Sequence, residues 1–199
     1  LVTQYFSWVK GVMVGDLGQS LITRRAVVED VKEFLPATIE LALVSAILVV
    51  VFSILFGTIA AKYRDKWPDA LIRVMAYSGV AIPAFVLAVL LLLLFGYIWP
   101  VIPVLGRLSS GITPPPNITG LVMLDSLITG NLAAFWDGFK HIIVPAMALA
   151  AGPLFQEARI VRTAMTDNMG KDYLAAATGY GIPSRVIMSK YLLKPSLIP

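Results

Sequence analysis

Two long runs of apolar residues limit what this chain can fold into. Residues 74–99 contain no charged side chain, and residues 38–61 contain one, Glu40. A helix of about 20 residues crosses the ~30 Å hydrocarbon core of a bilayer, so each run is long enough to span a membrane. Apolar residues make up 58% of the chain and charged residues 14%, too few charges to cover a soluble domain. The runs therefore predict a helical membrane protein and exclude a soluble enzyme and a disordered chain.

A third span is predicted over residues 141–161, which are apolar but interrupted by proline and glycine. The second span, 74–99, carries a similar interruption at Ser78, Gly79 and Pro83. Such breaks are tolerated where neighbouring helices or water satisfy the freed backbone groups. These three residues fit either a kinked helix lining a translocation path or a simple packing feature, and the sequence leaves both open.

The segments outside the spans differ in character. Residues 1–36 predict an amphipathic external segment, with a short helix over 5–13 and a second helix that ends at Pro36. Residues 100–138 are rich in proline and predict a long loop that holds one short helix. The segment 162–199 is polar and basic, and its pattern predicts a helix, a glycine turn and a second helix.

The distribution of Lys and Arg predicts the orientation. The loop 62–73 carries four cations and the segment 162–199 carries several, whereas the loop 100–138 has one, Arg107. The positive-inside rule places the first two in the cytoplasm and the third outside. The net charge of +4 is thereby explained without nucleic acid. The first 36 residues then lie outside without a preceding span, so we expect the chain to be the central part of a longer protein, truncated at both ends.

Several chemistries lack the residues they need. The chain has no cysteine and one histidine, His141, which we expect to have a capping or interfacial role, so no metal site is predicted. The sequence contains no P-loop and no hydrolase motif, so no catalytic residue is assigned. Glu40 and Glu157 lie near span ends, where we expect them to reach the interface or pair with Arg159 or Arg162. No carboxylate is predicted at the midplane, which disfavours proton coupling, although a fragment of an ion-gradient-driven secondary transporter or channel stays an alternative.

Four ordered motifs carry a resemblance to a known family. Residues 172–199 (DYLAAATGYGIPSRVIMSKYLLKPSLIP) resemble the EAA coupling loop of the permease subunits of binding-protein-dependent ABC importers, in the dipeptide, oligopeptide and nickel branch. Residues 15–20 (GDLGQS), 35–42 (LPATIELA) and 80–85 (VAIPAF) resemble other segments of the same family. The literal Glu of the EAA consensus is absent; Asp172 and Tyr173 are the residues nearest to its place.

The resemblance implies an all-α, polytopic core like that of type I ABC importer permeases, forming one domain over residues 1–199 with three spans and a cytoplasmic coupling helix. It implies a path for peptides or similar small solutes across a bacterial or archaeal cytoplasmic (inner) membrane. The implied partners are a second homologous permease, two ABC ATPase subunits that bind ATP–Mg, an external substrate-binding protein and membrane lipid. No cofactor is implied for this chain itself. The residues that the resemblance assigns to ATPase coupling are Asp172, Tyr173, Ala175, Ala176, Ala177, Gly179, Gly181, Pro183 and Ser184.

Overall fold

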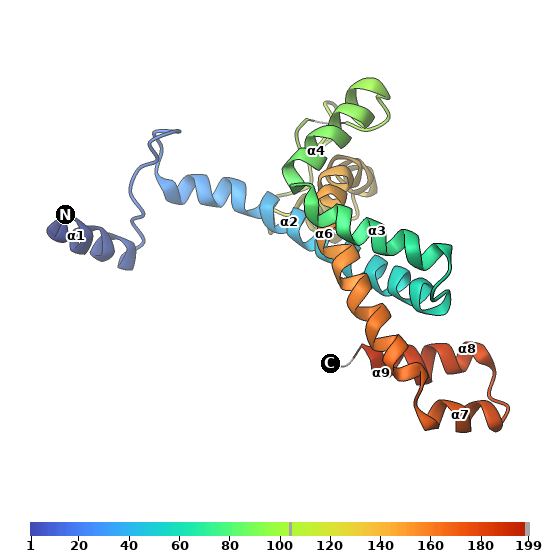
Figure 1. The fold of residues 1–199 in the computed structure, drawn as a ribbon. Helices are drawn as coiled ribbons and strands as arrows, with labels where there is room; N and C mark the ends of the chain where they lie inside the picture. The colour runs from blue at the N-terminus through green and yellow to red at the C-terminus, as the bar shows by residue number, and fades with distance from the viewer. Residues whose placement is uncertain (104, 198–199) are drawn as a thin grey trace. The chain divides into compact units, whose positions relative to one another are not determined.

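A computed structural model describes residues 1–103 and 105–197, and over these residues the protein is helical, with one isolated bridge between Gln19 and Ala26 (Figure 1). The all-α class is confirmed. The elements in chain order are α1 (Val2–Met13), α2 (Val27–Lys62), α3 (Trp67–Ala81), α4 (Ala84–Leu92), the π-helix η1 (Leu93–Ile98), α5 (Val122–Ile128), α6 (Leu132–Met169), α7 (Asp172–Gly179), α8 (Ser184–Val186), the π-helix η2 (Ile187–Leu193) and α9 (Lys194–Ser196).

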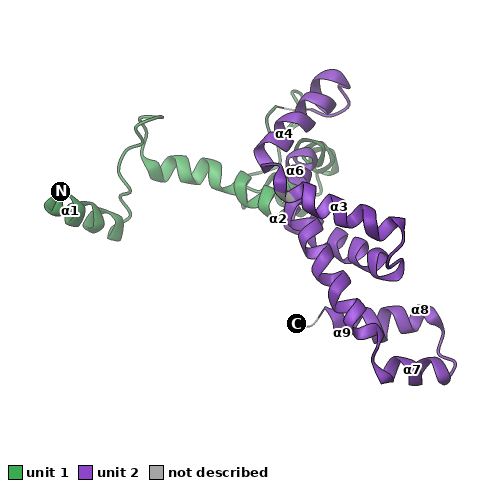
Figure 2. Ribbon diagram, viewed as in Figure 1, with its two compact units in different colours: residues 1–43, 105–141 green, residues 44–104, 142–199 purple. Residues whose placement is uncertain are grey.

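The chain, expected to form one domain, groups into two compact units (Figure 2). The first unit contains residues 1–43 and 105–141, which correspond to the predicted external segments and the start of the first span. The second unit contains residues 44–104 and 142–199, which include the rest of the spans and the predicted coupling segment. Each unit therefore joins segments that are far apart in the sequence.

The first predicted span is part of a longer helix. Helix α2 runs for 36 residues from Val27 to Lys62 and contains Pro36 in its interior. The prediction that a helix ends at Pro36 is therefore wrong. An interior proline removes one backbone hydrogen bond, but the chain on either side has helical periodicity, and the helix continues through it. The boundary expected at residues 36–38 is a position within one helix.

The second predicted span, 74–99, is not a single helix. It is divided between α3 and the pair formed by α4 and η1, and the two parts are bent by 104°. The break lies at Ile82 and Pro83, where Ile82 has an extended backbone (φ −96°, ψ 119°) and caps the end of α3. A residue that precedes proline is pushed out of the helical region, which explains the break at this position.

The third predicted span forms the middle of α6, which has 38 residues and continues through both Pro145 and Pro153. The expected boundaries at 138–141 and 161–162 are therefore positions inside one helix. Helices α2 and α6 are each long and apolar enough to cross a membrane, and the bent pair makes a third span if it is counted as one. The short helix expected in the loop 100–138 is present as α5, before α6 begins at Leu132.

Helix α6 packs closely on α2 in the second unit because the contact lacks side-chain bulk. A Cβ added to Gly57 would lie 2.6 Å from the Cβ of Val161 and 2.7 Å from the carbonyl oxygen of Ala158. Small residues at such crossings let two helix backbones approach in a membrane protein. A buried hydrogen bond of 3.2 Å from the Ser45 hydroxyl to the Ala146 carbonyl also joins the two helices.

Candidate functional site

Helix α7 is the element that the sequence assigns to coupling, and each of its ends lies one residue from the bounds Lys171 to Thr178 that the pattern predicts. Lys171 has an extended backbone and precedes the helix, and Asp172 supplies an acidic side chain in the first turn. A negative charge near a helix N-terminus interacts favourably with the helix dipole. Helix α7 ends at Gly179, within one residue of the predicted end.

One face of α7 packs against the protein. Leu174 is buried and belongs to a cluster with Ala61 of α2, Val161 and Met165 of α6, and Leu192 of η2. Met165, which is fully buried, lies at the centre of this contact. Truncating a buried leucine typically costs about 2–5 kcal/mol, so Leu174 is a strong attachment for an eight-residue helix.

The turn after α7 is a Schellman motif. Gly181 has φ +73° and follows Tyr180, the residue that caps the helix. The Gly181 amide donates to the Thr178 carbonyl at 3.0 Å, and the Ile182 amide donates to the Ala177 carbonyl at 3.2 Å. Glycine favours this left-handed position because a Cβ would meet the following carbonyl. The predicted glycine turn is confirmed, and Gly181 is the residue that sets its geometry.

The chain then returns to α6. Elements α8, η2 and α9 follow one another without a break, and Asn168 near the end of α6 donates a hydrogen bond of 2.9 Å to the Ser196 hydroxyl. Ser196 in turn donates to the Leu192 carbonyl at 2.7 Å. We call residues 172–197 the knob. Its two ends are fixed to the same end of α6, so it is a closed projection.

The other face of the knob is exposed. Tyr173 is 42% exposed and Tyr180 is 87% exposed. Ala177 differs from the other residues assigned to coupling, because it is buried and adds packing instead of accessible surface. The assigned residues that are exposed are Asp172, Tyr173, Ala175, Ala176, Gly179, Gly181, Pro183 and Ser184. The structure thus brings eight of the nine into one accessible segment.

A buried ion pair lies close to the knob. Asp69 in the first turn of α3 is fully buried, and Arg162 of α6 donates to both of its carboxylate oxygens, with 2.7 Å between Nη2 and Oδ2. Asp69 also accepts a hydrogen bond of 3.0 Å from the Asp65 amide. Breaking such a buried pair typically costs about 3–5 kcal/mol, because the remaining charge has no partner. The hairpin between α2 and α3 is thereby fixed to α6.

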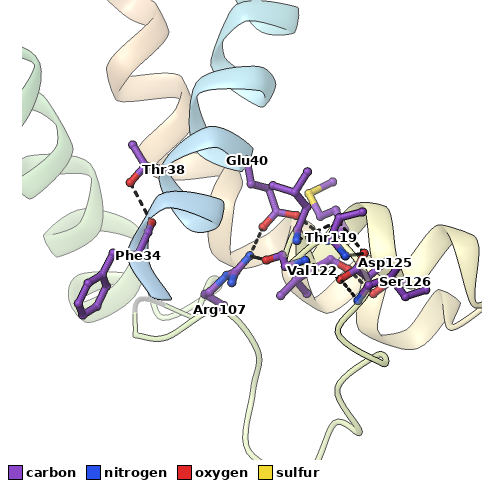
Figure 3. Close-up of polar contacts among 12 residues, drawn as sticks. Phe34, Thr38, Glu40, Arg107, Thr119, Val122, Asp125 and Ser126 are labelled. Atoms are coloured by element: carbon purple, nitrogen blue, oxygen red, sulfur yellow. Dashed lines mark hydrogen bonds and ion pairs between the residues drawn. The ribbon is translucent and has the colours of Figure 1, made fainter. Parts of the chain in front are cut away.

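The first unit contains a second polar cluster, shown in Figure 3. Glu40 of α2 is 7% exposed, accepts a hydrogen bond of 2.7 Å from Arg107, and accepts another from the Met123 amide at the start of α5. Arg107 also donates to the Gly120 carbonyl at 2.9 Å. Of the two alternatives expected for Glu40, pairing with Arg159 or Arg162 is not what the structure shows, because its partner is Arg107. Arg107 comes from the loop predicted to be external, and its guanidinium meets the only acidic residue of the first apolar run.

Asp125 holds the loop before α5 (Figure 3). Its carboxylate accepts hydrogen bonds from the amides of Ile118, Thr119 and Gly120, at 3.2, 2.9 and 3.1 Å, and from the Thr119 hydroxyl at 2.6 Å. Burial is the largest influence on the pKa of Asp125 and raises it, but the hydrogen bonds together lower the pKa below its ordinary value. The side chain is therefore ionised and acts as a structural anchor for the loop.

The other predicted residues are placed as follows. Gly79 lies in α3, where an added Cβ would be 3.2 Å from the Ala151 carbonyl oxygen, and Pro83 is the N-cap residue before α4. A packing role for Gly79 is thus present, and a role in a translocation path stays a prediction. His141 is buried inside α6 and contacts the Asp137 carbonyl through Nδ1 at 2.9 Å, so it does not cap a helix end, and the expected interfacial role stays a prediction. Within residues 1–103 and 105–197, no group of three or more His, Cys, Asp or Glu side chains is placed to hold a metal ion.

Asp69 and Asp125 have structural roles that the sequence interpretation missed. A signal for Asp69 was available, because it is an acidic residue in the first turn of a helix within a cation-rich hairpin. The signal for Arg107 was its position as the lone cation of the loop 100–138, which is predicted to be external. Neither signal identifies the partner residue. The partner of Arg107, Glu40, lies 67 residues away in the sequence, and the partner of Asp69, Arg162, lies 93 residues away.

Comparison with known families adds an independent observation. The profile of the family described as "binding-protein-dependent transport system inner membrane component" matches residues 53–199. This range includes the whole of α3, α4, α5, α6 and the knob. The match extends over about three quarters of the chain, far more than the coupling segment alone.

Individual relatives are similar over the whole chain. The probable D,D-dipeptide transport system permease protein DdpB of Escherichia coli K12 is 37% identical over all of this chain and 58% of its own length. The dipeptide transport system permease protein DppB of Alkalihalophilus pseudofirmus is 32% identical over 98% of this chain and 59% of its own length. The di/tripeptide permease protein DppB of Pseudomonas aeruginosa is 34% identical over all of this chain. The chain spans about three fifths of the length of these relatives.

Proposed function

Because the chain belongs to the family of binding-protein-dependent transport system inner membrane components, we propose that it forms part of the translocation path of an ABC importer for peptides or similar small solutes. ATP hydrolysis then takes place on separate ATPase subunits, and this chain transmits their movement to the membrane. The complete transporter contains two permease subunits, two ATPases that bind ATP–Mg and an external binding protein. The peptide class rests on the names of the relatives, which are permeases for dipeptides and tripeptides.

The observation that carries the proposal is the construction of the knob. Its outer face exposes Asp172, Tyr173 and Ala176, while Leu174 anchors its inner face on α6. A short helix that is exposed on one side and firmly attached on the other can dock in a groove of a partner and pass on its displacement. The proposed docking partner is the ATPase subunit, in the cytoplasm.

The ion pair between Asp69 and Arg162 supports the proposed orientation. It joins the first turn of α3, next to the loop after α2, to the part of α6 that leads into the knob. Both segments are rich in cations, and the positive-inside rule assigns both to the cytoplasm. Their proximity in the second unit agrees with a common side of the membrane.

Co-purification tests the proposal. The permease, expressed with candidate ABC ATPase subunits from the same organism, should retain them after detergent extraction. Ala176→Trp adds bulk to the exposed face of α7 and should abolish the association without changing the amount of permease in the membrane. Tyr97→Trp, at an 83% exposed position of η1, is the matched control and should leave the association intact. Retention of the ATPases by Ala176→Trp at the wild-type level would exclude docking through this face.

A further inference from the structure

Arg162 lies where two attachments to α6 meet. Val161, Arg162 and Met165 lie on about one turn of α6. Val161 and Met165 are four residues apart and share one face of the helix, whereas Arg162 faces a different neighbour. Val161 and Met165 pack against the cluster that holds Leu174 of the knob. Arg162 instead binds Asp69 at the start of α3. The same segment of α6 thus holds the knob by apolar packing and the α2–α3 hairpin by charge.

The ion pair is suited to transmit displacement. The Arg162 guanidinium makes two roughly parallel hydrogen bonds through Nε and Nη2, one to each oxygen of the Asp69 carboxylate. A two-point contact of this kind fixes the orientation of the partners as well as their distance. The Asp69 side chain has no exposed surface and that of Arg162 is 15% exposed, so water competes little for the contact. The ion pair adds this fixed orientation to the close packing of Gly79 of α3 against Ala151 of α6.

We infer that Asp69 and Arg162 are positioning residues for coupling, which make α3 move together with α6 and the knob. This inference rests on the proposed function. Displacement of the knob would then reach the membrane through two helices, because α3 leads to the break at Ile82 and Pro83. Without the ion pair, the knob would still dock but would move α6 alone.

Arg73 supplies a matched control on the same carboxylate. Its Nη2 lies 3.7 Å from Asp69 Oδ2, and its side chain is 45% exposed. Arg73 belongs to α3 itself, four residues after Asp69, so this contact does not join two helices. Removing the Arg73 charge changes the electrostatics of Asp69 but leaves the link between α3 and α6.

The test measures solute transported per ATP hydrolysed, in proteoliposomes that contain the assembled transporter. Arg162→Gln should lower this ratio by about tenfold, a change within the usual range of coupling between sites. Arg73→Gln should leave the ratio unchanged. Arg162→Lys keeps the buried charge but not the two-point contact, so it should insert normally and give an intermediate ratio. If Arg162→Gln does not accumulate in the membrane, the ratio measured for Arg162→Lys tests the inference in its place.

The ratio separates positioning from mere stability. A residue that only stabilises the fold lowers uptake and stimulated ATP hydrolysis together, and the ratio stays constant. A wild-type ratio in Arg162→Gln, or in Arg162→Lys where the glutamine variant is absent, overturns the inference while the proposed function stands. A wild-type permease that neither retains an ATPase nor imports solute overturns both.

Discussion

Replacing Gly181 with valine changes the backbone of the turn after α7 without creating a steric clash. Apart from Gly181 and its two chain neighbours, no atom would lie within 4 Å of a Cβ at this position, so the perturbation is confined to the local backbone conformation. Gly181 has φ +73°, and a non-glycine residue in this left-handed region is destabilised by roughly 1–2 kcal/mol. A β-branched residue is among the least tolerated there.

This free energy sets the size of the effect. About 1–2 kcal/mol lowers the population of the native turn relative to alternatives by a factor of about 5–30. The two hydrogen bonds that close the turn, from Gly181 and Ile182, are lost with it. Leu174 and the cluster around it are on the other side of α7, so the knob should stay attached. We expect membrane insertion to be normal and ATP hydrolysis to continue with little transport.

The assay compares solute uptake with ATP hydrolysis in proteoliposomes. Gly181→Asn is the conservative control, since asparagine enters the left-handed region more readily than other residues, and it should recover most of the coupling. Gly179→Ala lies two residues away inside α7, where an added Cβ would again meet no atom outside the local backbone within 4 Å. It should leave coupling unchanged and the free energy of unfolding equal or slightly higher. Wild-type coupling in Gly181→Val would refute the assignment of this turn to the docking element.

Three further perturbations test other parts of the structure. Gly57→Ala places a methyl group against Val161 and should lower the free energy of unfolding by about 1–3 kcal/mol, measured by thermal unfolding in detergent, while Gly170→Ala, in open space, should not. Leu174→Ala removes the anchor of α7 and should speed amide hydrogen exchange across residues 172–179; Tyr173→Ala, on the exposed face, should weaken ATPase retention and leave exchange unchanged. The pKa of Asp125 is lowered in the folded protein, so its stabilising contribution is complete above the ordinary pKa of 3.8 and is lost as pH falls through the lower folded value. Protection of the amides at 118–120, corrected for intrinsic exchange rates, should therefore decrease below pH 4 in the wild type and should be low at all pH values in Asp125→Leu; equal protection in both would show that the carboxylate does not hold the loop.

Local signals in the sequence were sufficient to predict the helix and the glycine turn of the knob. The helix over 172–179 and its end depend on neighbouring residues, because a glycine two residues past the helix end closes a Schellman motif through contacts at most five residues apart. The resemblance to the ABC importer permeases is confirmed by the family match over 53–199. Helix α1 was also predicted, over 5–13, for the same local reason, and it begins three residues earlier at Val2.

Helix boundaries and polar partners could not be predicted in this way. Proline was expected to end a helix at Pro36, yet Pro36, Pro145 and Pro153 all lie inside helices, whereas Pro83 breaks one. The local sequence does not distinguish these cases, because tertiary packing determines whether a kinked helix continues. The partner of Glu40 was missed for a related reason: the choice among Arg107, Arg159 and Arg162 depends on which loops the fold brings to each end of α2.

The absence of a side chain at Gly57 lets α2 and α6 approach closely, and a relative rotation of the two helices would take place about this contact. From Ala158, which faces that glycine, α6 extends 11 residues to its end at Met169, or about 17 Å at 1.5 Å per residue. A rotation of about 10° about this contact would move that end by about 3 Å, between the helix shifts of about 1–2 Å and the one-turn displacements of about 5.4 Å that occur at interfaces which switch. A bulky residue at position 57 would move the two helix axes apart and shift this contact. The distance that the end of α6, and with it the knob, moves for a given rotation therefore depends on a residue that has no side chain.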